Sequence, residues 1–345
     1  MSLAAVKFTA RIRHDAALVI RLGQLVALIT VLGCATPAQG IGPKRVLSRP
    51  LGAADGEIGV SKEGMRSGPQ GYAVDGDRNI FVADRWNHRI QKFNSDGEFE
   101  CSSGKSEHGA TVPLPLEIAV DLKGSVYVYG AAPRGMIIKL DSNCQELFRI
   151  RVKELRLGDV TGLDLDHHGN LCVRGAASRR LLRLNSDSSV IGMEEKVSGF
   201  LGGVGPYRYH LAVPPDDKRT IAVERAAPPA SWSDKEANER DVGEFVEWTR
   251  VRVQHDVVSC HYLGEDSRGA LYVFYRKRIP GDGFLYFVRI TSDGRLAGEI
   301  EVPYVSGGDL SRPYLVHWSG DLYIAGLDKT HYWIDCYPSE MFEQE

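Results

Sequence analysis

Three titratable side chains stand at the start of strand-like segments, where they could carry acid–base or metal chemistry. Glu117 opens the segment EIAVD, His210 opens HLAV, and His261 directly precedes YLGED. A carboxylate and two imidazoles can donate and accept protons near neutral pH, and both kinds of group bind metal ions. If the three segments line one site, these residues are a candidate acid, base or metal-ligand set. The alternative is that they are polar residues solvated by water.

The sequence contains none of the compact motifs that mark other catalytic sites. It has no GxSxG nucleophile elbow, no HExxH zinc motif, no phosphate-binding P-loop, and no GxGxxG dinucleotide motif after a strand. Any catalysis would therefore depend on residues that the fold brings together from separate segments.

Composition and charge narrow the function classes. Of the 345 residues, 43% are hydrophobic and 25% are charged, which is typical of a folded protein with a large core. The net charge is −3, but residues 1–33 hold four basic residues against one acid, so the rest of the chain carries −6. A body of that sign does not attract phosphate backbones, and nucleic acid is not an expected partner.

The feature that sets the fold is a repeat of paired short strands. Each unit has two strand-like segments on either side of a turn rich in Gly, Asp and Asn, the residues of tight turns. Equivalent positions in the six units are separated by 46, 45, 48, 52 and 53 residues, close to the period of about 40–50 residues of a propeller blade. These positions are Val74, Val120, Leu165, Val213, Glu265 and Trp318.

The first unit is the clearest copy. Residues 69–97 read PQGYAVDGDRNIFVADRWNHRIQKFNSDG. The Pro-x-Gly start, the VAD strand end and the NHRI segment before the third strand resemble an NHL repeat. That resemblance implies one blade of a β-propeller.

We therefore expect an all-β fold, a six-bladed β-propeller of NHL type, as one domain over residues 44–345. A unit this small cannot bury both faces of its own sheet, so the sheets must pack radially around an axis. The last unit shows only three strands, whereas the strand-like segment 44–48 (KRVLS) precedes the first unit. Pairing of 44–48 with 331–336 would supply the missing outer strand and close the ring.

The fourth unit is the least regular. We place its innermost strand at residues 210–213, and we expect loop 225–244 between its second and third strands, on the same face as loop 275–284. Ligand sites of propellers usually gather on that face, at the mouth of the central channel, because loops there sit on a rigid scaffold. Trp232, in the first loop, and Tyr314, where the last innermost strand begins, are the ligand-binding candidates.

The N-terminal segment is predicted to be a targeting signal rather than a folded domain. A basic stretch precedes the apolar run 22–32, which at about 11 residues is too short to span a membrane and fits an export signal. The segment VLGC at 31–34 resembles a bacterial lipobox. It implies a signal peptide over 1–33, a lipid on Cys34 and a tether over 34–43.

The resemblance also suggests a destination. Ala35 is not the Asp of an inner-membrane retention signal, so a Gram-negative host implies an outer-membrane lipoprotein anchored through its lipid. Otherwise the protein is secreted or periplasmic. Two alternatives stay open: an ordinary signal cleaved near residues 35–39, and an uncut signal anchor.

The cysteines indicate no disulfide framework. Five remain if Cys34 carries lipid, none forms a CxxC pair, and three fall inside apolar strand patterns where a buried thiol acts as a small hydrophobe. These three are Cys172, Cys260 and Cys336.

Known catalytic sets of similar propellers are not reproduced. The lyases that split peptidyl-hydroxyglycine hold zinc with three His, two of them just before innermost strands, and only His261 stands at such a position here. His88 lies in a loop comparable to that of the remaining ligand, but NHRI is ordinary in non-catalytic NHL blades. The carboxylate and amide set of gluconolactonase-like propellers is not evident. No metal site or cofactor is predicted, and zinc or calcium is expected only if the protein is an enzyme.

The sequence thus favours a non-catalytic binding module of the cell envelope. Its ligand would be an envelope or extracellular protein, peptide or glycan bound at the channel face. The alternative is a propeller lyase or hydrolase with a metal or acid–base site at the channel mouth, formed by Glu117, His210 and His261. A third hypothesis is a purely structural envelope component.

Overall fold

The fold was analysed in a computed structural model, in which the described residues all belong to one compact unit, Gly42–Glu345. They are residues 42–61, 67–104, 112, 114–131, 135–155, 160–165, 169–175, 181–184, 190–194, 200–201, 207–226, 244–277, 283–303, 310 and 312–343. The predicted signal peptide, the lipidation candidate Cys34 and the ligand-binding candidate Trp232 lie outside the described residues.

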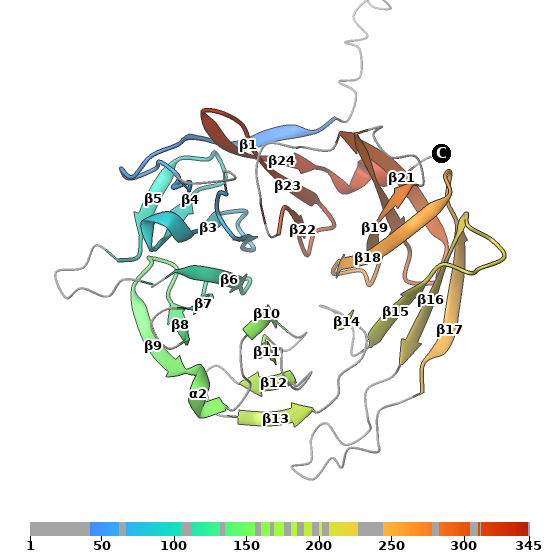
Figure 1. The fold of residues 1–345 in the computed structure, drawn as a ribbon, viewed down its shortest axis with the longest axis horizontal. Helices are drawn as coiled ribbons and strands as arrows, with labels where there is room; N and C mark the ends of the chain where they lie inside the picture. The colour runs from blue at the N-terminus through green and yellow to red at the C-terminus, as the bar shows by residue number, and fades with distance from the viewer. Residues whose placement is uncertain are drawn as a thin grey trace, which may run out of the picture. The chain divides into compact units, whose positions relative to one another are not determined.

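The described strands form six four-stranded antiparallel sheets that follow one another along the chain (Figure 1). The first sheet contains β2 (Tyr72–Val74), β3 (Ile80–Asp84), β4 (Arg89–Phe93) and β5 (Phe99–Ser102). The second contains β6 (Pro115–Val120), β7 (Val126–Gly130), β8 (Met136–Leu140) and β9 (Glu146–Arg151). The third contains β10 (Val160–Leu165), β11 (Leu171–Gly175), β12 (Leu181–Leu184) and β13 (Val190–Glu194).

The later sheets continue this order, with one exception at the end. The fourth contains β14 (Phe200–Leu201), β15 (Arg208–Ala212), β16 (Thr220–Ala226) and β17 (Val246–Arg252). The fifth contains β18 (Val257–Glu265), β19 (Leu271–Lys277), β20 (Phe284–Ile290) and β21 (Leu296–Pro303). The sixth contains β22 (Tyr314–Val316), β23 (Leu322–Leu327), β24 (His331–Tyr337) and, as its outer strand, β1 (Lys44–Pro50).

The outer strand of the sixth sheet joins the two ends of the unit. β1 pairs antiparallel with β24, from Lys44 opposite Cys336 to Pro50 opposite His331. The pairing that we expected between residues 44–48 and 331–336 is therefore present. Leu47 on β1 is 1% exposed and belongs to the core shared by the first and sixth sheets.

Helical structure is minor in the described part of the chain. It consists of α2 (Val152–Leu155) and the 3-10 turns η1 (Arg85–Asn87) and η2 (Ser339–Phe342). None of these could span a bilayer. The architecture is all-β, as the sequence predicted.

Alternation of side chains explains why the sheets stack on one another. All five residues of β3 are buried. Ile80 and Val82 belong to the core shared with the sixth sheet, and Phe81 and Ala83 to the core shared with the second. Successive side chains of a strand point to opposite faces, so one apolar strand supplies two interfaces. Five neighbouring pairs of sheets share such a described core.

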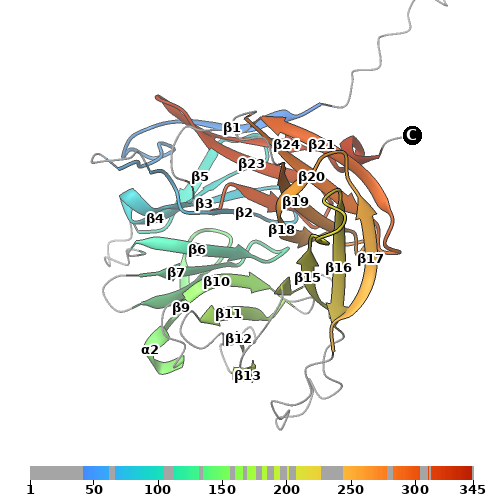
Figure 2. The ribbon, with the colours of Figure 1, turned by 45° about the vertical axis from the view of Figure 1, so that its right-hand side comes forward.

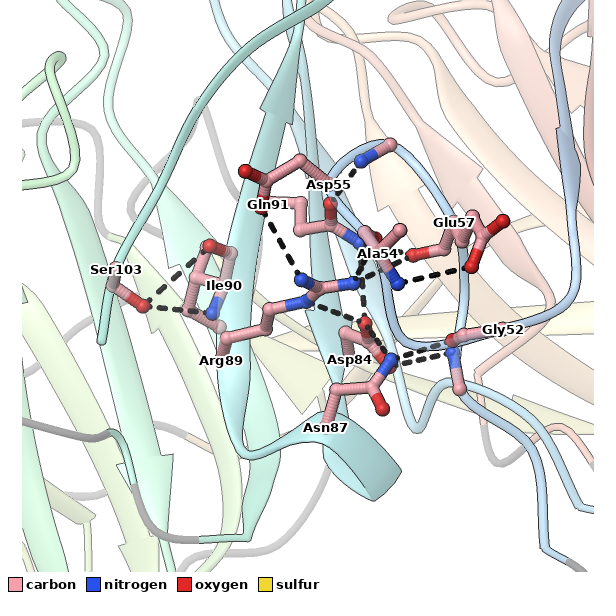
Figure 3. Close-up of polar contacts among 12 residues, drawn as sticks. Gly52, Ala54, Asp55, Glu57, Asp84, Asn87, Arg89, Ile90, Gln91 and Ser103 are labelled. Atoms are coloured by element: carbon pink, nitrogen blue, oxygen red, sulfur yellow. Dashed lines mark hydrogen bonds and ion pairs between the residues drawn. The ribbon is translucent and has the colours of Figure 1, made fainter. Parts of the chain in front are cut away.

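A buried polar network fixes the segment that leads into the first sheet (Figure 3). The Asp84 carboxylate is fully buried and accepts hydrogen bonds from Arg89 Nε at 2.9 Å and from Gly59 N at 2.9 Å. The Arg89 guanidinium also donates to the Ala54 and Glu57 carbonyls at 2.7 and 2.8 Å. Desolvation raises the pKa of Asp84, while these hydrogen bonds act in the opposite direction. The VAD and NHRI segments thus have a structural role here.

The fourth sheet corrects our assignment of its strands. β14 precedes β15 and pairs with it through Phe200 opposite Tyr209 and Leu201 opposite Arg208. Residues 210–212 therefore belong to the second strand, not the innermost one, and Val213 follows that strand. Residues 227–243 connect the third and fourth strands, whereas 278–282 connect the second and third strands of the fifth sheet. The strands that precede the two loops, β16 and β19, are the third and the second of their sheets and so run in opposite directions, which does not support the expectation of a shared face. Most residues of the two loops lie outside the described residues.

A disulfide between Cys101 and Cys144 corrects the expectation that the cysteines are unpaired. Their Cα atoms are 6.2 Å apart, and the bond joins β5 of the first sheet to the β8–β9 turn of the second. The separation of 43 residues is close to one repeat period, so stacking brings the two positions together. Cys144 has φ +62°, at a turn position that Gly97 (φ +79°) and Gly294 (φ +87°) occupy in other sheets. The cross-link explains why a side chain is kept where glycine is favoured.

We predict that Cys101→Ser lowers the free energy of unfolding by about 2–4 kcal/mol under oxidising conditions, because the unfolded chain loses a cross-link. Cys144→Gly should be about 1 kcal/mol more stable than Cys144→Ala, since both lose the disulfide but only glycine relieves the positive φ. Urea denaturation of the three variants measures both differences. The assignment is wrong if dithiothreitol leaves the stability of the wild type unchanged.

Candidate functional site

An ion pair between distant parts of the chain defines the candidate site. Arg312, two residues before β22 of the sixth sheet, places Nη2 2.8 Å from Oε2 of Glu117 on β6 of the second sheet. The apolar cores of the sixth sheet are shared with the first and fifth sheets, so these two sheets are not packing neighbours. Figure 1 shows β6 and β22 toward the middle of the unit. The ion pair therefore crosses between the inner strands.

The third sheet supplies a second ion pair beside the first. Arg174 Nη2, on β11, lies 3.1 Å from Oδ2 of Asp164 on β10. Arg312 also reaches this sheet, with its Nη2 3.5 Å from the Thr161 carbonyl oxygen. The four charged residues therefore come from three sheets. We call Glu117, Asp164, Arg174 and Arg312 the inner cluster.

Local backbone features make room for this approach. A Cβ atom added at Gly162 on β10 would lie 3.1 Å from Arg312 Nη2 and 3.8 Å from Arg174 Cβ. The missing side chain thus leaves space for both arginines. The register of β10 against β11 shifts between Val160 and Gly162, and that of β6 against β7 shifts between Pro115 and Glu117. Such bulges redirect side chains at the start of a strand.

Burial gives Glu117 an unusual proton affinity. Its side chain is 15% exposed, against 36% for Arg312. Its pKa is raised to about 7, with desolvation as the largest cause and the charge of Asp164 adding to it, while Arg312 and Arg174 act in the opposite direction. Its Oε2 is buried and accepts no well-aligned hydrogen bond from any residue in the described ranges. The guanidinium group therefore holds this oxygen mainly by charge.

The other two titratable candidates have separate partners. His210 lies on the second strand of the fourth sheet, where its Nδ1 is 3.0 Å from Oε2 of Glu224. His261 lies on β18 and stacks on Phe274 with ring centroids 4.7 Å apart, and desolvation lowers its pKa. The structure thus does not join Glu117, His210 and His261 by direct contacts. The expected position of His210 on an innermost strand is wrong because β14 occupies it.

The aromatic candidate Tyr314 is part of a packed group. Its ring centroid is 5.3 Å from those of Phe274 and Phe287, between the fifth and sixth sheets. His88 accepts a hydrogen bond at Nδ1 from Leu114 N at 3.2 Å, at the end of η1. Among the described residues, no three His, Cys, Asp or Glu side chains are grouped so that they could hold a metal ion.

Sequence reasoning found Glu117 but missed Arg312, Arg174 and Asp164. A signal was available for two of them. Arg312 lies two residues before the first strand of the last unit, and Arg174 is near the end of the second strand of the third unit. In a propeller these two positions lie at the same end of their sheets. The distance between the second and sixth sheets, which allows Arg312 to pair with Glu117, cannot be read from the sequence.

Comparison with known families supports this fold. Residues 67–93 match the NHL repeat. The matched residues therefore form an NHL repeat within the first sheet. The match covers β2, β3 and β4 and includes Asp84 and Arg89 of the network in Figure 3, but not their partners in the preceding segment. A search of curated protein sequences finds no match.

Several solved structures show weak similarity to this chain. Hydrazine synthase of Kuenenia stuttgartiensis has 15% identity and a TM-score of 0.46, over 76% of this chain and 75% of that one. An inactive virginiamycin B lyase of Staphylococcus aureus has 14% and 0.45, over 87% and 90%. The gluconolactonase XC5397 of Xanthomonas campestris has 14% and 0.42, over 87% and 99%. Likenesses this weak carry no argument about the activity of this chain.

The raised pKa of Glu117 predicts a specific dependence of stability on pH. Because the folded state holds a proton up to about pH 7 and an unfolded Glu releases it near 4.5, the free energy of unfolding should fall as pH rises through this window. Relative to Glu117→Gln, the wild type should lose on the order of 3 kcal/mol between these limits. Urea denaturation at pH 4.5, 6 and 7.5 measures this. Glu301→Gln, an exposed change on β21, is the control and should follow the wild type. Parallel profiles for the wild type and Glu117→Gln would contradict the assignment.

Proposed function

We propose that this protein is a non-catalytic binding module of the cell envelope, and that its ligand, a protein, peptide or glycan, binds at the inner cluster. The observation that carries this proposal is the ion pair between Arg312 and Glu117, which links sheets that do not pack on each other. Removing the Glu117 carboxylate from water costs free energy that the attraction of Arg312 only partly offsets, so stability alone is a weak reason for the pair. A ligand site is the better explanation.

The scaffold suits a binding role. Three members of the inner cluster lie on β6, β10 and β11, strands of four-stranded sheets that share a buried core, and Arg312 lies two residues before β22. Rigid strands hold charged groups more accurately than loops do. We also propose that the six sheets close into a six-bladed ring of NHL type, which would set Arg312 opposite the second and third blades.

An enzymatic alternative has one specific observation in its favour. A pKa of about 7 suits a general acid or base working at neutral pH, and Glu117 has that value next to two guanidinium groups. This second candidate is a lyase or hydrolase in which Glu117 transfers the proton. Perturbed acids occur at catalytic sites and also in structural networks, so the pKa alone does not decide between the two functions.

The binding proposal is tested by probing arrays of peptides and oligosaccharides with the purified, labelled protein. Arg312→Gln should weaken binding to the recognised probe about tenfold or more, because a charged hydrogen-bonding group is lost. Arg250→Gln, which removes an arginine of an exposed pair with Glu247 on β17, is the matched control and should bind like the wild type. Equal binding by all three proteins would contradict the proposed site, and turnover of the probe that is lost in Glu117→Gln would favour the enzyme.

We also propose that the protein is exported. Its N-terminal sequence has the basic and apolar regions of a signal, and the Cys101–Cys144 disulfide supports an oxidising compartment, where such bonds persist. The membrane partner would be reached through a lipid on Cys34, which gives an outer-membrane lipoprotein in a Gram-negative host.

Cys34→Ser should move the protein out of the membrane fraction of its host or leave the precursor uncleaved, because the thiol that would accept the lipid is gone. Fractionation and the mass of the mature protein measure this. As a control, Cys172→Ser changes a buried thiol of β11 and should leave the membrane fractionation and the mature mass unchanged. Unchanged fractionation and mass for Cys34→Ser would refute the lipoprotein assignment.

A further inference from the structure

The charges around Glu117 suggest what kind of ligand the inner cluster takes. Arg312 faces Glu117 from the segment before β22, Arg174 faces it from β11, and Asp164 faces it from β10. The cluster thus sets two guanidinium groups against the two carboxyl groups of Asp164 and Glu117. When Glu117 is protonated, the cluster carries a net positive charge. In that state the inner cluster lacks one negative charge, which a carboxylate of a ligand could supply.

We propose that Glu117 occupies the place of a ligand carboxylate, and that an acidic peptide displaces it from Arg312. This inference rests on the proposed binding function and names its ligand class. The Arg312 side chain is 36% exposed, so an incoming carboxylate can reach it, while its present partner is the more buried of the two. Guanidinium groups bind carboxylates in a forked geometry, which makes this replacement chemically like for like.

The exchange requires a proton. The ligand carboxylate replaces the Glu117 carboxylate on Arg312, and the released Glu117 would leave a negative charge in a desolvated place beside Asp164. Taking up one proton at Glu117 removes that charge, so the total charge of the cluster with its ligand stays balanced. No covalent bond is made or broken. Binding should therefore become tighter as the pH falls.

A peptide is favoured over an acidic glycan by what surrounds the charges. Arg312 also contacts the Thr161 carbonyl oxygen, and Gly162 leaves space beside the side chains of Arg312 and Arg174. The backbone N–H of an extended peptide can donate a hydrogen bond to such a carbonyl while a peptide carboxylate binds the guanidinium group. An acidic side chain or a peptide C-terminus fits these groups.

Calorimetry on the purified protein tests the inference with a capped tetraglutamate peptide as the probe. Between pH 6 and pH 8 the dissociation constant of the wild type should rise about tenfold, as the fraction of protonated Glu117 falls. In Glu117→Gln it should stay level, and at pH 8 this variant should bind about tenfold tighter than the wild type. Comparing buffers of different ionisation enthalpy at pH 8 should show uptake of close to one proton by the wild type and of none by Glu117→Gln.

Arg312→Gln should abolish binding of this peptide, and Arg250→Gln should leave it unchanged. Melting temperatures of the wild type, Glu117→Gln, Arg312→Gln and Arg250→Gln show whether these four proteins are folded at both pH values. Arg312→Lys keeps the charge but loses the fork, and partial binding by it would support direct contact with a carboxylate.

Four results would overturn the inference while leaving the proposed function standing. The first is an equal pH dependence of binding in Glu117→Gln and the wild type, which would assign the proton to another group. The second is weaker binding by Glu117→Gln, which would make Glu117 a contact of the ligand. The third is that capped tetraglutamine binds as tightly as tetraglutamate, and the fourth is that tetragalacturonate binds and tetraglutamate does not. If none of the four proteins binds any of these probes and Arg312→Gln leaves the array signal unchanged, the proposed function fails as well.

Discussion

Each four-stranded sheet of this protein has two apolar faces, and both must be covered. The strand β23 shows the constraint: Leu322 and Ile324 belong to the core shared with the fifth sheet, and Tyr323 and Ala325 to the core shared with the first. A single sheet cannot satisfy this alone, and a row of sheets would leave two open faces at its ends. Neighbouring sheets cover these faces by packing on one another, and pairing of β1 with β24 ties the last sheet to the start of the unit (Figure 2).

That constraint also determines where chemistry can gather. Inner strands of different sheets begin at the same end of the molecule, so residues that precede or open them can meet although they are far apart in sequence. Arg312 and Glu117 meet in this way, 195 positions apart, and Arg174 with Asp164 joins them from a third sheet. The outer strands, by contrast, carry exposed pairs such as Arg250 with Glu247, which cost little and contribute little.

Two other polar features serve stability rather than binding. Asp84 is fully buried and pairs with Arg89, which also donates hydrogen bonds to two backbone carbonyls of the segment before the first sheet. These bonds hold that segment in place. The disulfide of Cys101 and Cys144 links the first two sheets at their outer edge. The inner cluster differs from both, because the Glu117 carboxylate is desolvated without a full set of aligned donors. A ligand could supply the interactions that these charged groups do not make within the described residues.

The sequence by itself determined the strand repeat, the turn positions, the NHL repeat over residues 67–93 and the closing role of residues 44–48, because these depend on local alternation and on turn chemistry. It misplaced the fourth innermost strand, since β14 pairs over only two residues and leaves no alternating pattern. Glu117 could be selected as a strand-opening carboxylate. Its partner Arg312, its raised pKa and the pairing of Cys101 with Cys144 were decided only by the tertiary structure. Charge, desolvation and cross-linking depend on distances between sheets, and these distances exist only once the sheets have packed.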